Sequence, residues 1–120
     1  MAFCTFQTTT VIPVGSVVKA NGSSIVLNDD AADSVLVGVV KATYDDEDGN
    51  HYAQVHLGGG VVEATLSAAW DGLFCPITVD GSGIRPANSG EDYHGYLISQ
   101  LPPVAKVSGD LAVIYWRGLV

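Results

Sequence analysis

Residues 14–40 decide the fold and read VGSVVKANGSSIVLNDDAADSVLVGVV, and residues 71–97 repeat their pattern as DGLFCPITVDGSGIRPANSGEDYHGYL. Both stretches share an opening glycine, a Gly-Ser pair, a polar acidic loop and a second glycine within an apolar run: Gly15, Gly22-Ser23 and Gly38, then Gly72, Gly81-Ser82 and Gly95. The outer glycines are 23 residues apart in each stretch. Residues 53–58 and 112–118 also match. The pattern indicates two copies of a β unit of about 45–50 residues.

Short runs rich in Val, Ile and Thr alternate with Gly, Pro, Asn and Asp along the whole chain. This spacing predicts an all-β fold, a compact β-barrel or sandwich in which equivalent strands close one core. Residues 35–43 are almost entirely apolar or β-branched, which is typical of a strand buried on both faces. Asn21-Gly22 predicts a type I′ hairpin turn. Only residues 67–71 would allow a helical turn.

Residues 1–13, MAFCTFQTTTVIP, have no counterpart in the second half. Their threonines favour extended backbone, and Pro13 suits a strand entry. We therefore expect an extended N-terminal arm, residues 1–13, followed by a single β domain, residues 14–120, with repeats at 14–62 and 71–120. The arm carries Phe3 and Phe6 and either folds back onto its own core or adds a strand to a neighbouring subunit. Deleting residues 1–12 is expected to leave the domain folded.

The composition excludes several classes of function. Apolar residues make up 48% of the 120 residues and charged residues only 15%, so part of the apolar surface is expected to be buried against other chains. The net charge is −8 with only five Lys and Arg, too few for a nucleic-acid-binding stripe. The sequence has no run of 18 apolar residues and no recognisable signal peptide, which predicts no membrane partner and synthesis in the cytoplasm.

Two acidic stretches invite a cation site. Residues 45–50 read DDEDGN, but an EF-hand loop with Gly49 in sixth place would need an acid at Tyr44 and Glu at Val55. The alternatives for this stretch are a loose cation site and a solvated hairpin tip whose charges block edge pairing. The same two interpretations apply to Asn28-Asp29-Asp30 with Asp33, and the solvated one is favoured in both places.

The remaining chemistry-bearing residues form no constellation. His51 and His56 are five residues apart on one strand and point to opposite faces, and no metal-binding pattern joins them to His94. Cys4 and Cys75 are expected to be free thiols, because two distant cysteines make no disulfide framework. We expect no catalytic residue, metal or cofactor, and hence no enzyme.

Tyr115 and Trp116 are adjacent in the last apolar run, so one is expected to face the core and the other to face outward. An outward aromatic is a common anchor at a subunit interface. The alternatives are a core corner and a platform on which a sugar stacks.

Residues 15–18, the run Val37-Gly38-Val39-Val40, the strand before Gly58, and the reprise at Gly72 and at 93–97 resemble small structural proteins of tailed bacteriophages, specifically capsid decoration (cement) proteins. The resemblance implies a non-enzymatic virion protein on the outer capsid surface, often a homotrimer, that stabilises the shell by bridging major capsid proteins. It also implies shell contact through the arm. The predicted partner-binding residues are Phe3, Phe6, Thr8, Thr9, Thr10, Ile12, Tyr115 and Trp116.

Two other classes of function stay open. One is a virion module associated with the tail, collar or fibre, with possible carbohydrate binding. The other is a small metal-binding or enzymatic β domain.

Overall fold

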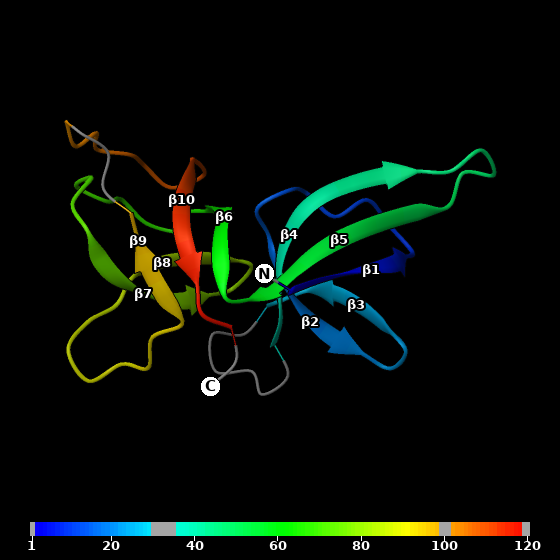
Figure 1. The fold of residues 1–120 in the computed structure, drawn as a ribbon, viewed down its shortest axis with the longest axis horizontal. Coiled ribbons are helices and arrows are strands. Elements are labelled where there is room, and N and C mark those ends of the chain that lie inside the picture. Colours follow the sequence, from blue (N-terminus) through cyan, green and yellow to red (C-terminus); the bar gives the residue numbers. More distant parts are fainter. Residues whose placement is uncertain (1, 30–35, 99–101, 119–120) are drawn as a thin grey trace.

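The computed structural model describes residues 2–29, 36–98 and 102–118. These residues form ten strands and no helix, which confirms the predicted all-β fold (Figure 1). No helix in the described ranges could cross a membrane. The strands make two five-stranded antiparallel sheets that lie side by side along the 44 Å long axis of the molecule.

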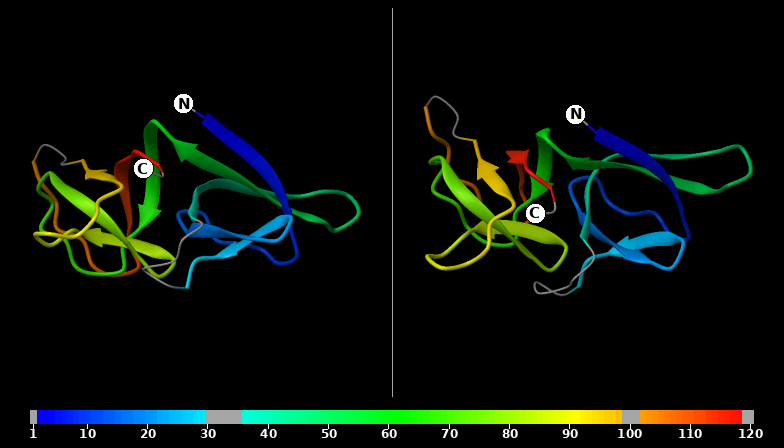
Figure 2. Two further views of the ribbon diagram at one scale, coloured as in Figure 1. Left: turned by 90° about the horizontal axis from the view of Figure 1, so that it is seen from below. Right: turned by 60° about the horizontal axis from the view of Figure 1, so that its bottom comes forward.

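The first sheet contains the first five strands in the spatial order β1-β5-β4-β2-β3. Their bounds are β1 (Ala2–Thr8), β2 (Val17–Asn21), β3 (Ser24–Leu27), β4 (Leu36–Asp45) and β5 (His51–Gly58). β1 pairs with β5 along its whole length and lies at the outer edge of this sheet (Figure 2). The sheet curls until its edge strands meet, where the Ser24 hydroxyl donates a hydrogen bond of 2.9 Å to the Gln7 carbonyl.

The second sheet contains the last five strands in the order β6-β10-β9-β7-β8. Their bounds are β6 (Gly60–Thr65), β7 (Cys75–Asp80), β8 (Gly83–Pro86), β9 (Gly95–Leu97) and β10 (Leu111–Trp116). This sheet curls in the same way, because Leu66, directly after β6, forms a parallel bridge with Ile84 in β8.

The two sheets have the same connectivity. Replacing each strand of the first sheet by the strand five places later in the chain gives the order of the second sheet. This relation is consistent with a duplicated unit, and it pairs 2–58 with 60–116. The counterpart of β1 is therefore β6. The sequence alone left residues 1–13 without a counterpart. It also ended the first copy at residue 62, which lies inside β6.

The matched glycines have matched roles. Gly22 and Gly81 open the two tight turns with φ of 62° and 59°. Gly38 and Gly95 occupy β4 and β9, where a Cβ atom would collide with a carbonyl of the neighbouring strand, that of His56 or of Tyr115. In both copies the glycine is therefore required because two backbones approach closely.

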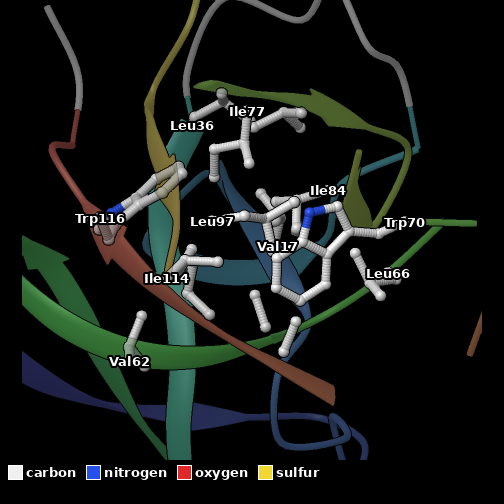
Figure 3. Close-up of a cluster of buried hydrophobic side chains, with 14 residues drawn as sticks. Val17, Leu36, Val62, Leu66, Trp70, Ile77, Ile84, Leu97, Ile114 and Trp116 are labelled. Carbon is white, nitrogen blue, oxygen red and sulfur yellow. The ribbon is translucent and has the colours of Figure 1, made fainter. Parts of the chain in front are cut away.

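The buried side chains form two hydrophobic clusters that stabilise the sheets, whereas the sequence predicted one core. The larger fills the second sheet and contains Trp70, Leu97 and Trp116; it also takes in Val17 and Leu36 from the first sheet (Figure 3). The smaller lies inside the first sheet. Neighbouring residues of β4 enter different clusters, since Val39 belongs to the larger and Val40 to the smaller. This part of β4 is thus buried on both faces, as predicted.

Several local expectations were wrong. Gly22 has positive φ but none of the described non-glycine residues does, so the turn has the single positive φ of a type II′ turn and not the two of type I′. Residues 67–71 form no helical turn, because Trp70 makes a backbone bridge with Lys106 instead. β9, the strand that contains the second inner glycine, is short and spans only Gly95–Leu97; residues 99–101 lie outside the described residues.

Candidate interaction surfaces

The structure divides the predicted partner-binding residues into an exposed and a buried group. Phe3, Thr9, Thr10 and Tyr115 are exposed. Thr8, Ile12 and Trp116 are buried inside the chain, and Phe6 packs against the smaller cluster. The adjacent aromatics divide as expected, with Trp116 in the core and Tyr115 39% exposed. Surface contacts by the buried group would require this fold to open.

The N-terminal arm is part of the first sheet. Residues 2–8 form β1, and their partner is β5 of the same chain, which is the folded-back alternative. β1 nevertheless leaves its other side free of a ladder partner, because it ends the strand order. The first charged residue of the chain is Lys19, so this edge carries none of the charges that usually protect an edge strand.

A second exposed surface lies on the outward face of the second sheet. The strand register places Val61, Tyr115, Tyr96 and Pro76 side by side across β6, β10, β9 and β7. Phe74, 62% exposed, stacks on Tyr96 at a ring-centroid distance of 5.2 Å. Of this row, only Tyr115 was predicted from the sequence. Alternation within residues 95–97 could have identified Tyr96, since its neighbours Gly95 and Leu97 are buried.

A groove of about 430 Å³ extends this surface toward the first sheet. Its lining includes Val14, Val61 and Val113 together with Lys41 of β4 and Glu63 of β6. Lys41 also stands over the exposed Phe3 ring, 4.7 Å from its centroid. We call the continuous surface the apolar band and define it as Val14, Val61, Val113, Tyr115, Tyr96 and Phe74.

Cations flank the apolar band. Lys41 lies at the groove, and Arg117 lies 4.5 Å from the ring centroid of Tyr93, which itself contacts Tyr96. The guanidinium donates to the Tyr93 carbonyl at 2.9 Å. Among the described residues, neither Lys41 nor Arg117 makes an ion pair with a carboxylate, whereas Lys19 and Arg85 do. Glu63 lines the same groove as Lys41, so the groove carries one acid and one base.

The acidic hairpin between β4 and β5 uses one carboxylate to fold itself. Asp46 accepts hydrogen bonds of 2.9 Å from the backbone N–H groups of Asp48 and Asn50. It also accepts from the Asn50 amide and the Tyr52 hydroxyl. These bonds, chiefly those from Asn50, hold the pKa of Asp46 below its usual value. Glu47 and Asp48 remain exposed at the tip.

The polar loop after β8 is held by a forked ion pair. Arg85 donates to both Glu91 oxygens at 2.8 and 2.6 Å, and the Asn88 backbone N–H donates to the same carboxylate at 2.6 Å. The hydrogen bonds from Arg85 are the main reason that the pKa of Glu91 falls to about 2. This carboxylate therefore organises the loop after β8.

Three side chains near the ends of β5, β9 and β10 have buried polar atoms without a hydrogen-bond partner among the described residues. They are both ring nitrogens of His56, Nδ1 of His94 and the indole nitrogen of Trp116. Burial lowers the pKa of both histidines, and the charges of Lys41 and Arg117 add to the effect at His56 and His94 respectively. The neutral rings are therefore the forms that the fold favours.

The described residues contain no group of three or more His, Cys, Asp or Glu side chains that could hold a metal ion. Of the predicted acidic loop at 28–33, Asp30 and Asp33 lie outside the described residues. Cys4 is exposed and Cys75 is half-buried, both as free thiols. Burial raises the pKa of the Cys75 thiol, which opposes a nucleophilic role.

Comparison with known proteins gives no relative: no family model, no curated protein and no solved structure matches the chain.

Proposed function

We propose that this chain is a non-enzymatic structural protein of a tailed-phage virion that binds the outer surface of the capsid and bridges major capsid proteins. The observation that carries the proposal is the outer edge of β1, which has no ladder partner and meets β3 near Gln7 through the Ser24 hydroxyl. It is a seven-residue strand at the end of a sheet and has no charged side chain. Natural edge strands usually carry charges or prolines that prevent pairing, and their absence suits an edge that pairs with a partner.

The residues around this edge support a contact with protein. Phe3, Thr5 and Gln7 are exposed on β1, and Thr9 to Val11 continue the exposed uncharged surface beyond it. A partner strand added here would gain backbone hydrogen bonds along β1 and side-chain contacts with Phe3. The partners we propose are the major capsid protein and further copies of this chain.

Co-sedimentation with empty shells of the major capsid protein from the same genome tests this function. The edge variant Thr5→Lys/Gln7→Lys places two charges on β1, where both side chains are exposed, and Val107→Lys is a control on a distant exposed turn. We expect the wild type and the control to pellet with shells and the edge variant to stay in solution. A wild type that does not pellet with shells would refute the proposed function. An edge variant that pellets with shells like the wild type would refute the contact through β1.

A second candidate is a tail or fibre module that binds carbohydrate. It is favoured by a groove of about 440 Å³ whose lining includes Asp71 and Phe74. An aromatic ring can stack on the apolar face of a sugar, and a carboxylate beside it can accept hydrogen bonds from the sugar hydroxyls. Binding to a glycan array that Phe74→Ala abolishes, together with failure to bind shells, would favour this candidate over the first.

A further inference from the structure

The apolar band is a sheet face that nothing in the described chain covers. It runs from the groove beside β4 across β6, β10 and β9 to Phe74, and Val61 and Phe74 are 52% and 62% exposed. Soluble monomers rarely expose a contiguous apolar surface of this kind unless it binds something. The charges around the band indicate what that is.

Two unpaired charges of opposite sign lie in the groove. Lys41 comes from the first sheet and Glu63 from the second, and neither makes an ion pair within the described part of the chain. A surface that carries one acid and one base beside apolar residues is complementary to a copy of itself rotated by 180°. The Lys41 of each copy then faces the Glu63 of the other.

We propose that the apolar band is the interface of a two-fold symmetric dimer in which two copies of this chain pack antiparallel. Tyr115, Tyr96 and Val61 form its apolar centre, and Lys41 pairs with the Glu63 of the other copy across the groove. This arrangement differs from the homotrimer that the family resemblance implies. It does not depend on capsid binding, because it concerns the purified chain alone.

Sedimentation equilibrium of the purified wild type at micromolar concentration is the first test. The expected mass is twice the 12.5 kDa of the chain. Tyr115→Asp places a charge at the centre of the band and should give the mass of one chain, while Val107→Glu, outside the band and 62% exposed, should leave the dimer intact. Circular dichroism confirms that each variant is folded.

A mixing experiment tests the pairing of Lys41 with Glu63. Lys41→Glu alone places acid against acid, and Glu63→Lys alone places base against base, so each should weaken dimerisation about tenfold or more. In an equimolar mixture, one chain of each kind restores two opposite-charge pairs, and the dimer mass should return. A wild type of one-chain or three-chain mass would overturn the proposal, and so would two variants that dimerise normally or a mixture that stays monomeric.

Discussion

Gly58 and Gly118 lie against each other at the point where the two sheets meet. A Cβ atom on Gly58 would lie 3.0 Å from the Gly118 Cα, and a Cβ on Gly118 would lie 3.2 Å from the Gly58 Cα. Each glycine closes one of the matched runs, 53–58 and 112–118, so corresponding residues of the two copies are in contact. The side of the backbone that faces the other sheet has no room for a side chain.

Gly58→Ala and Gly118→Ala should each lower the free energy of unfolding by about 2–4 kcal/mol, since both positions combine positive φ with crowding. Gly59→Ala is the matched control, because Gly59 has a φ of 80° but open space around it. It should cost only the backbone strain, about 1 kcal/mol. Urea denaturation followed by circular dichroism measures all three. Equal losses at Gly58 and Gly59 would show that the contact between the sheets is unimportant.

Acid should destabilise the fold through His56. Burial lowers its pKa in the folded state below 6.5, the value expected in the unfolded chain. The unfolded state therefore binds the proton more readily than the folded state. The contribution of His56 to the free energy of unfolding is fully present above pH 6.5 and is lost as the pH falls from 6.5 toward the folded-state pKa. His94 contributes in the same direction. Urea midpoints measured between about pH 5 and 8 should fall on the acid side.

His56→Leu tests the origin of this acid sensitivity. The substitution removes a titrating group and two ring nitrogens that have no partner among the described residues. The variant should lose less stability on acidification than the wild type, with the remaining loss due to His94. An unchanged pH dependence would mean that the imidazole of His56 stays solvated or finds a partner in the folded chain.

Removing the charge of Glu91 should loosen the loop after β8. Its pKa of about 2 lies below the ordinary 4.5, so the stabilisation is present above pH 4.5 and is lost as the pH falls through about 2. Glu91→Gln should therefore lower the urea midpoint at neutral pH. Glu47→Gln, at an exposed position in the other acidic loop, should leave it unchanged. The idea fails if both substitutions have the same effect.

Deleting residues 1–12 should unfold the chain, contrary to what the sequence alone led us to expect. The deletion removes one of the two ladder partners of β5 and takes Phe6 and Ile12 out of the smaller cluster. We expect loss of the β-sheet signal in circular dichroism and of a cooperative transition on heating. A truncated chain that still melts cooperatively would show that β1 is a detachable arm.

The glycine framework made the all-β fold predictable from the sequence. Gly38 and Gly95 recur at one spacing because each copy needs the same close approach of two strands, and such a need is visible in sequence. The role of β6 was not visible, because β1 and β6 share a place in the sheet but no residue pattern. The place of a strand in a sheet depends on pairing between distant segments, and short-range periodicity does not report such pairing.

The interaction surfaces were predictable only in part. Phe3 and Tyr115 were predicted because large aromatic side chains that face outward are common anchors at interfaces. The apolar band was missed because its members come from distant parts of the chain; Val61, Tyr115 and Tyr96 become neighbours only through the register of β6, β10 and β9. Trp116 was predicted to bind a partner because it is paired in sequence with Tyr115. The alternation of exposed and buried residues along β10 places the Trp116 side chain in the core.

Electron cryomicroscopy of capsid shells incubated with this chain tests the central claim most directly. We predict density on the outer surface of the shell, at sites between major capsid subunits, into which the 44 Å long molecule fits with β1 closest to the shell. Shells that carry no added density, or density with β1 facing solvent, would contradict the account.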